Sequence, residues 1–196
     1  MEPMGFSAGM GVFYMVQTRV AVITSSPELG FWLSKWWNNP LPDVELVQVI
    51  CNRSHMRSDQ FPVRMLRRED FPSQEAFEFA LLEEWMGHRV DYVIAWEFDL
   101  LFSSRILDVF SHKVLNVHPS LLPQFAGFPE KVYRDVLQSK PSQSGATLHE
   151  IDEGVDTGQI IAQQSFSLAQ DESLFSLKEK TRKVGMELIL DYFLKK

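Results

Sequence analysis

Short apolar runs rich in β-branched residues alternate with amphipathic segments through the first 117 residues. Such runs predict buried strands, and apolar positions that recur every three or four residues predict helices. The strands are predicted over residues 20–23, 44–50, 61–66, 91–95 and 113–117. The helices are predicted over residues 27–37, 73–87 and 103 or 104 to 110. Strands that alternate with helices indicate right-handed crossovers, so the sequence predicts an α/β, Rossmann-like fold whose mostly parallel sheet has helices on both faces.

After residue 117 this alternation stops. A proline-rich loop over residues 119–129 precedes a helix that ends near residue 138. Two late strands are then predicted over 145–151 and 159–166, and an amphipathic C-terminal helix over 173–194. No internal repeat or linker divides the chain, so we expect a single domain over residues 19–196.

The N-terminal segment, residues 1–18, is rich in small and apolar residues but carries only one charge before residue 19, at Glu2. A signal peptide has a basic segment at its start, so this composition favours a loosely ordered leader, with Met15 as a possible internal start. No stretch reaches the roughly 18 uninterrupted apolar residues of a membrane helix, so no membrane partner is predicted.

The charge balance adds a constraint on partners. Nineteen Lys and Arg residues against 26 Asp and Glu give a net charge of −7, whereas general nucleic-acid binders usually carry a basic excess. Nucleic acid is therefore not a predicted partner. Cys51 is the only cysteine, which excludes an intrachain disulfide and favours a reducing, cytoplasmic location.

Three loops follow the predicted strand ends where open parallel sheets bind ligands: residues 24–28, 116–129 and 152–158. Asn116 and His118 are two residues apart, so their side chains share one face of a strand and can donate hydrogen bonds to one developing oxyanion. The same residues also suit a polar strand end before a rigid turn.

The acidic turn over residues 152–158 also has two interpretations. It is either a hairpin-like turn in which glycine supplies positive φ, or a loop that aims Asp156 at His118 and favours the imidazolium form. His118, His149, Asp152 and Asp156 have no recognised metal-ligand spacing, so no metal site is predicted.

Two sequence blocks resemble the folate-dependent formyltransferases. Residues 116–123, Asn-Val-His-Pro-Ser-Leu-Leu-Pro, are similar to their asparagine-x-histidine signature, and residues 144–163 are similar to a later block at the usual separation. Cys51-Asn52-Arg53 and residues 71–77 resemble the glycinamide ribonucleotide formyltransferase branch. The resemblance covers most of residues 19–194 and implies the formyltransferase fold.

The resemblance implies transfer of a formyl group from 10-formyltetrahydrofolate to an amine, without a metal. Asn116, His118 and Asp156 match the family's three catalytic positions. The matching cofactor-binding positions are Trp96, Phe98, Leu100, Leu101, Phe102, Ile151, Asp152 and Val155. Of the five tryptophans, core packing explains four better than stacking on a ligand does. The expected partners are thus folate and a small-molecule amine.

On the acceptor side, the resemblance implies contacts from Ser25, Ser26, Gln74, Pro119 and Arg182. This side departs from the ribonucleotide branch, whose loop after the first strand cradles the substrate phosphate. Pro27 removes a backbone donor and Glu28 adds negative charge. Gln74 replaces an arginine, Arg182-Lys183 replaces a Glu-His pair, and residues 128–131 lack a histidine.

The acceptor therefore stays open between phosphoribosylglycinamide, the first expectation, and another amine such as an amino sugar nucleotide or hydroxyornithine. Arginines in residues 53–68 either form a replacement anion site or a solvated basic loop; they are Arg53, Arg57, Arg64, Arg67 and Arg68.

Two further functions use the same residues. A formyltetrahydrofolate deformylase would use water as nucleophile, although such enzymes usually carry an N-terminal regulatory domain, for which residues 1–19 are too short. A non-catalytic folate- or nucleotide-binding protein would not need the three catalytic positions intact. The sequence does not distinguish a monomer from a homodimer.

Overall fold

The computed structural model describes residues 17–53, 56 and 58–196, so the predicted leader over residues 1–18 lies almost wholly outside the described part. The strands are β1 (Thr18–Thr24), β2 (Val44–Cys51), β3 (Val63–Met65), β4 (Tyr92–Trp96), β5 (Val114–His118), β6 (Gln143–Glu150) and β7 (Ile160–Ser167). The helices are α1 (Gly30–Asn38), α2 (Gln74–Gly87), α3 (Ser104–Val109), α4 (Pro129–Ser139) and α5 (Leu174–Leu194), with 3₁₀ turns at Pro27–Leu29 and Arg68–Asp70.

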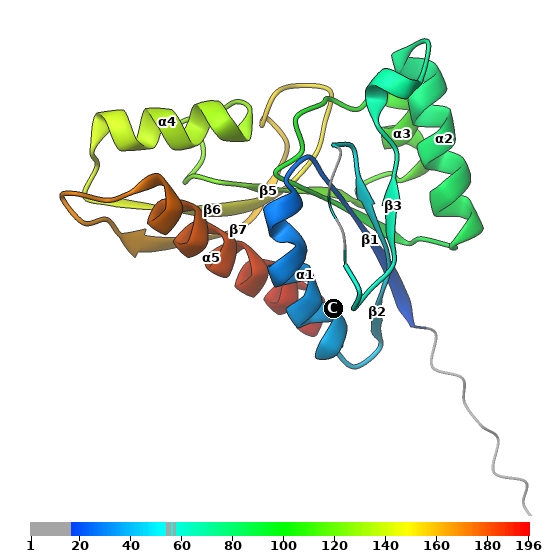
Figure 1. Ribbon diagram of the computed structural model, residues 1–196, viewed down its shortest axis with the longest axis horizontal. Helices are drawn as coiled ribbons and strands as arrows, with labels where there is room; N and C mark the ends of the chain where they lie inside the picture. The colour runs from blue at the N-terminus through cyan, green and yellow to red at the C-terminus, as the bar shows by residue number, and fades with distance from the viewer. Residues whose placement is uncertain (1–16, 54–55, 57) are drawn as a thin grey trace, which may run out of the picture.

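The seven strands form one sheet in the order β3-β2-β1-β4-β5-β6-β7 (Figure 1). Strands β1 to β5 pair in parallel, whereas β6 and β7 pair antiparallel. The chain runs outward from β1 to β3 and then returns to β4 beside β1. In open sheets with such a reversal, ligands usually bind beyond the carboxyl ends of the strands. The predicted α/β class, with two late strands and a C-terminal helix, is confirmed.

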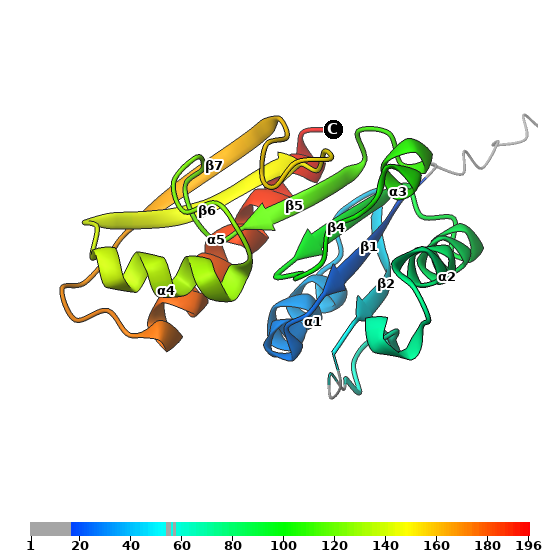
Figure 2. The ribbon, with the colours of Figure 1, turned by 90° about the horizontal axis from the view of Figure 1, so that it is seen from above.

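Helices cover both faces of the sheet because side chains alternate along each strand. Val20 and Val22 of β1 join the core under α1 and α5, whereas Ala21 and Ile23 join the core under α2 and α3. Figure 2 shows the sheet between these two helical layers. Four tryptophans are buried, as core packing predicts; they are Trp32, Trp36, Trp85 and Trp96.

A glycine lets α5 lie close to the sheet. A Cβ at Gly185 would stand 2.7 Å from Cγ1 of Val117 and 3.3 Å from the Trp96 ring. The contact lies directly behind β5, on the face opposite Asn116 and His118. α5 therefore supports the strand that carries both polar side chains.

Two predicted elements differ from the structure at their starts. The helix predicted from residue 27 begins with a 3₁₀ turn, because the Ser26 hydroxyl donates to Glu28 at 2.6 Å rather than capping an α-helix. The third strand covers only Val63–Met65 rather than 61–66, since Pro62 has no N–H to donate to a neighbouring strand. Ser73 and Ser173 cap α2 and α5 through hydrogen bonds of 3.1 Å.

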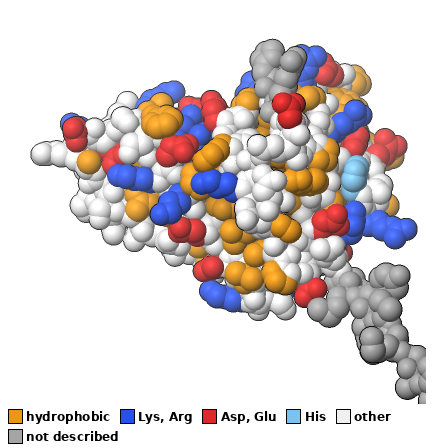
Figure 3. Space-filling model, turned by 60° about the horizontal axis from the view of Figure 1, so that its bottom comes forward, with side chains coloured by type: hydrophobic (Ala, Val, Ile, Leu, Met, Phe, Trp, Pro, Cys, Tyr) orange, Lys and Arg blue, Asp and Glu red, His pale blue; other side chains and the backbone are white. Residues whose placement is uncertain are grey.

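One face of the molecule carries charges of both signs. Figure 3 shows Lys and Arg side chains interspersed with Asp and Glu and with scattered hydrophobic groups on that face, rather than one basic patch. Among the described residues, no helix is long and apolar enough to cross a membrane.

Candidate active site

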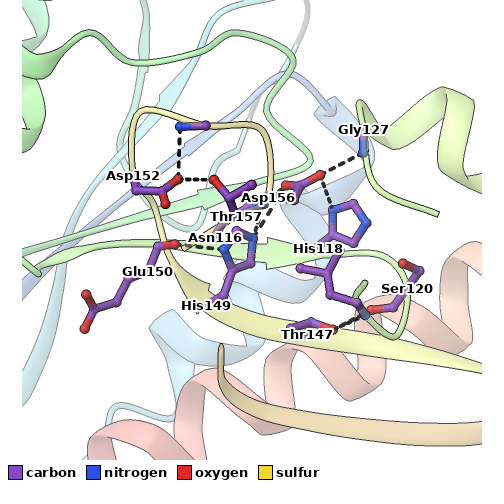
Figure 4. A network of polar contacts seen from close by, with 12 residues as sticks. Asn116, His118, Ser120, Gly127, Thr147, His149, Glu150, Asp152, Asp156 and Thr157 are labelled. Carbon is purple, nitrogen blue, oxygen red and sulfur yellow. Dashed lines mark hydrogen bonds and ion pairs between the residues drawn. The ribbon is translucent and has the colours of Figure 1, made fainter. Parts of the chain in front are cut away.

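Asn116, His118 and Asp156 converge at the carboxyl end of β5 (Figure 4). The first two lie on one face of β5, and the loop after β6 brings Asp156 over them. The Asn116 Nδ2 atom lies 3.4 Å from Oδ1 of Asp156, and the His118 Nδ1 atom lies 3.4 Å from Oδ2. The separate polar side chains of the sequence therefore form one cluster.

The imidazole of His118 is almost completely buried, at 1% exposed. Its Nε2 atom lies 2.9 Å from the carbonyl oxygen of Phe125. A carbonyl only accepts hydrogen bonds, so Nε2 carries a proton. The other ring nitrogen faces the Asp156 carboxylate. Both ring nitrogens thus face acceptors, an arrangement that suits an imidazolium.

His149 orients the amide of Asn116. β6 pairs with β5 so that His149 stands opposite Asn116. Its Nδ1 lies 2.8 Å from the carbonyl oxygen of Glu150 and therefore carries the proton, which leaves Nε2 to accept from Asn116 at 3.0 Å. The sequence identified His149 only as an unsupported metal ligand. Its position beside Asn116 depends on the pairing of β6 with β5, which no local sequence pattern indicates.

The carboxylate of Asp156 is held in its charged form. Burial alone would raise its pKa, but the contact with His118, the positive charge of that ring and the Gly127 N–H at 2.7 Å together hold the pKa well below its usual value. The backbone of Asp156 is left-handed, with φ of 55°. Aspartate tolerates this conformation better than most residues do.

The glycines of the acidic turn are needed for space rather than for positive φ. The left-handed residue is Asp156, not Gly154 or Gly158, so the expectation that glycine supplies positive φ here was wrong. A Cβ at Gly158 would stand 1.9 Å from the carbonyl oxygen of Glu150, because the chain crosses closely at the base of the loop.

A narrow cleft opens above the polar cluster and encloses about 650 Å³ counted out to its open side. Of the predicted cofactor-binding residues, it is lined by Phe98, Leu100, Leu101, Phe102, Ile151, Asp152 and Val155. Trp96 does not line the cleft. It is 1% exposed and packs against α5, because its position in β4 points to the other face of the sheet.

The predicted acceptor-binding residues do not line one common cavity. Ser25 and Ser26 line a second cavity, which meets the first cleft at Phe128 and Pro129. Pro119 lines the first cleft instead. Gln74 lines neither; its amide donates to Glu78 at 3.0 Å and to the Leu101 carbonyl at 3.1 Å.

Arg182 is a buried ion-pair partner rather than a free cation. It is 3% exposed and donates to both carboxylate oxygens of Glu97, at 2.8 and 2.9 Å. Burial would lower the pKa of Arg182, but Glu97 holds it above the usual value. Tyr133 also donates to Glu97, at 2.8 Å. Burial and the negative charge of Glu97 raise the pKa of its phenol well above the usual value. Sequence reasoning did not identify this pairing.

The described arginines of residues 53–68 do not gather into an anion site. Arg64 pairs with Glu84 at 2.8 Å, Arg67 with Asp70 at 2.6 Å, and Arg68 donates to Gln74 at 3.1 Å. Arg57 lies outside the described residues. Among the described arginines of this segment, only Arg53 lines the second cavity, where it pairs with Asp99.

No group of three or more His, Cys, Asp or Glu in the described part of the chain is arranged to hold a metal ion. The first cleft instead joins apolar walls to a polar end at Asn116 and Asp156. Apolar walls with a few polar groups at one end are typical of a site for a small organic molecule.

Known proteins are similar to this chain in both sequence and fold. The family model described as formyl transferase matches residues 18–192. Phosphoribosylglycinamide formyltransferase of Bacillus subtilis is 26% identical over 148 residues, which cover 72% of this chain and 75% of the relative. The trifunctional purine biosynthetic protein adenosine-3 of Drosophila melanogaster is 32% identical over 71% of this chain. That match spans only 11% of the fly protein's length.

Solved structures agree. Phosphoribosylglycinamide formyltransferase from Bacillus halodurans superposes with a TM-score of 0.77 and 26% identity, covering 88% of this chain and 92% of that one. A formyltetrahydrofolate deformylase from Pseudomonas syringae has the same fold, with a TM-score of 0.76 at 23% identity over 91% of this chain and 60% of that one. Because the family model spans nearly the whole described chain, this protein belongs to the formyl transferase family.

Proposed function

We propose that the protein transfers the formyl group of 10-formyltetrahydrofolate to an amine. The observation that carries this proposal is the convergence of Asn116, His118 and Asp156 at the polar end of an apolar cleft. Family membership supports it, and so do the relatives whose names state formyl transfer. The folate is proposed to occupy the first cleft, and the amine the second cavity.

The chemistry requires a stabilised oxyanion. A neutral amine attacks the formyl carbon, and the carbonyl oxygen gains negative charge. Nδ2 of Asn116 and Nδ1 of His118 are the donors proposed to face that oxygen. Their present contacts to Asp156, at 3.4 Å, are longer than ordinary hydrogen bonds. Both N–H groups can therefore donate to the developing charge at little cost, while the contacts with His149 and Phe125 keep the two side chains in place.

We propose that Asp156 keeps the His118 ring protonated and does not itself carry a proton in the free enzyme. Its lowered pKa keeps it ionised near neutral pH, so it favours the imidazolium. The carbon–nitrogen bond to the folate then breaks. The amine loses one proton and the departing folate nitrogen gains one, through water at the cluster.

The expected acceptor from the sequence is phosphoribosylglycinamide, and the names of the bacterial relatives support it as the reference compound. The same three residues with water as nucleophile would instead release formate. Turnover that depends on an amine separates the two reactions.

The test is to follow tetrahydrofolate release from 10-formyltetrahydrofolate with and without an added amine. We expect amine-dependent release that disappears in His118→Ala. His112→Ala is the matched control, because His112 is an exposed histidine paired with Glu150 outside the cleft. Equal release without any amine would contradict formyl transfer and favour hydrolysis.

A further inference from the structure

The loop between β5 and α4, residues 119–128, supplies two of the contacts that orient the polar cluster. Its Phe125 carbonyl lies 2.9 Å from Nε2 of His118, and its Gly127 N–H donates to Asp156 at 2.7 Å. The geometry of the cluster therefore depends on the shape of this loop. Phe125 has a left-handed backbone, with φ of 54°, which is unusual for a bulky side chain. Such a conformation persists only where surrounding contacts hold it.

Thr147 of β6 binds the first part of this loop. It pairs with His118 across the two strands, so the two side chains share one face of the sheet. The hydroxyl of Thr147 donates to the Ser120 carbonyl at 2.6 Å and accepts from the Leu122 N–H at 3.1 Å. Figure 4 shows the first of these bonds close to His118. Thr147 and Ser120 are completely buried, so water does not compete for these contacts.

Gln163 of β7 adds a second support. It pairs with Thr147 across β6 and β7. Its amide nitrogen donates to the Leu122 carbonyl and to the Thr147 hydroxyl, both at 2.9 Å. A hydroxyl offers one proton and two lone pairs, so the Thr147 hydroxyl makes all the hydrogen bonds that it can. Two neighbouring strands thus hold the N–H and the carbonyl of Leu122 at the same time.

This support reaches His118 through one turn of the loop. The Ser120 hydroxyl donates to the Gln124 carbonyl at 2.6 Å, and the Gln124 N–H donates to the Leu121 carbonyl at 3.0 Å. Gln124 directly precedes Phe125, whose carbonyl faces the ring. A displacement of Ser120 would therefore carry the Phe125 carbonyl away from Nε2 of His118.

The two supporting side chains lie outside both ligand cavities. Among the described residues, the linings of the first cleft and of the second cavity include neither Thr147 nor Gln163, whereas His118 lines the first cleft. A substitution at either position therefore acts on the reaction through the loop and not through a ligand contact.

We propose that Thr147 and Gln163 are positioning residues for formyl transfer. They fix residues 120–122, and the fixed loop keeps the Phe125 carbonyl on Nε2 of His118. The ring then keeps its orientation, with Nδ1–H directed at the oxygen that gains charge. This inference rests on the proposed function and adds to its site two residues that touch neither substrate.

Two substitutions of Thr147 separate positioning from stability. Thr147→Val keeps the shape of the side chain but leaves the Ser120 carbonyl and the Leu122 N–H without this partner. We expect its kcat with glycinamide ribonucleotide to fall by about 10- to 100-fold, while the Kd of 10-formyltetrahydrofolate stays within about two-fold. Thr147→Ser keeps the hydroxyl and loses a buried methyl group. It should unfold at a lower urea concentration and yet retain most of the kcat.

Thr181→Val is the matched control for the loss of a buried hydroxyl. Thr181 is 1% exposed, and its hydroxyl has no hydrogen-bond partner in the described part of the chain. We expect this variant to keep its kcat within about two-fold of the original value, because no partner is left unpaired. Equal losses of kcat in Thr147→Val and Thr181→Val would overturn the inference.

The hydrogen bond of His118 gives a readout that does not depend on turnover. In protein labelled with ¹⁵N-histidine, the Nε2–H proton of His118 is assigned by its loss in His118→Ala. We expect this resonance to lie downfield in the protein and in Thr147→Ser, and to move upfield or vanish through exchange in Thr147→Val. An unchanged resonance in Thr147→Val, or a kcat that follows the free energy of unfolding in both variants, would contradict a positioning role.

Gln163 provides the test should Thr147→Val fail to fold, because it is an exposed residue of β7. Gln163→Leu removes both donors to the loop support, so we expect kcat to fall by about three-fold or more and the His118 resonance to shift. Gln164→Leu is the matched control, since Gln164 points to the other face of β7 and donates to Glu187 at 2.8 Å. Equal effects of the two variants would count against the proposal.

The two levels of the account fail differently. If the protein releases no tetrahydrofolate with any amine, the proposed function fails, and the His118 resonance still decides whether Thr147 holds the ring. If formyl transfer occurs but Thr147→Val keeps the kcat of the protein, the positioning role fails and formyl transfer stands.

Discussion

At the scale of single residues, the site depends on a chain of oriented groups. The carbonyl of Glu150 sets which nitrogen of His149 is protonated, and His149 then fixes the Asn116 amide with its NH₂ group toward Asp156. The carbonyl of Phe125 fixes His118 in the same way. Donors held in advance need little reorganisation when charge develops, which is the basis of oxyanion stabilisation.

Removal of the amide donor should slow the chemical step. We expect Asn116→Ala to lower kcat by about 10²- to 10³-fold, the usual cost of one lost oxyanion donor, with a small change in folate affinity. Rapid-quench measurement of tetrahydrofolate formation checks this. A variant that retains more than about a third of the original kcat would rule out a donor role for Asn116.

The acidity of Asp156 makes a pH-dependent contribution to stability. The folded pKa lies below the ordinary value of 3.8, so the stabilisation is complete above that pH and is lost as pH falls through the folded pKa. Asp156→Asn is neutral at every pH. We therefore expect the difference in unfolding free energy between the protein and this variant to shrink as pH falls below 3.8.

Urea unfolding of both proteins across this pH range measures that difference. Asp99→Asn is the comparison variant, since Asp99 also has a lowered pKa but lies in the other cavity. A difference for Asp156→Asn that stays constant or grows on acidification would show that the cluster does not favour the carboxylate.

At the scale of elements, the pattern of apolar residues predicted most strands and helices, because the central strands are buried on both faces as short apolar runs and the helices bury one side. It predicted the meeting of Asn116 with His118 as well, since alternate positions share a face of a strand. For Asp156 the residues alone left two interpretations open, and the resemblance to a known family favoured the one that places it beside His118. The pairing of Arg182 with Glu97 was not predictable, because 85 residues separate them and neither lies in a recognisable local pattern.

The contact between α5 and the sheet gives a test at this scale. Gly185→Ala places a Cβ 2.7 Å from Val117, so we expect a loss of about 1–3 kcal/mol in unfolding free energy through overpacking. Gly87→Ala is the matched control. A Cβ there meets nothing within 4 Å, and alanine favours the helix by up to about 1 kcal/mol.

Chemical denaturation of the two alanine variants gives both values. Because Gly185 lies behind β5, we also expect Gly185→Ala to lower kcat, whereas Gly87→Ala should not. Equal stability of the two variants would contradict the close packing of α5 on β5.

At the scale of the whole molecule, a buried polar network joins distant parts of the chain. Glu97 follows β4, Tyr133 belongs to α4 and Arg182 belongs to α5; all three are at most 5% exposed. The network fills the space between the sheet and two helices beside the second cavity. The charge of Glu97 is compensated only while Arg182 is present, and Tyr133 adds a neutral hydrogen bond to the same carboxylate.

Breaking this network should destabilise the fold. We expect Arg182→Met to cost about 3–5 kcal/mol, because it leaves the Glu97 carboxylate buried without its cation. The double variant Glu97→Gln/Arg182→Met removes both charges and should recover most of that loss, since the new side-chain amide can still accept from Tyr133. Thermal and urea unfolding check both variants. A cost below about 1 kcal/mol for Arg182→Met is the value of an exposed ion pair and would contradict the burial of this one.

The most direct test of the central claim is the fate of the formyl carbon. We would supply 10-formyltetrahydrofolate with a ¹³C-labelled formyl group, add an amine acceptor, and follow the label by NMR and mass spectrometry. The account predicts that the label appears as a formamide on the acceptor, and that this product is lost in His118→Ala. Label that appears only as formate, or that stays on the folate in the presence of every amine tested, would contradict it.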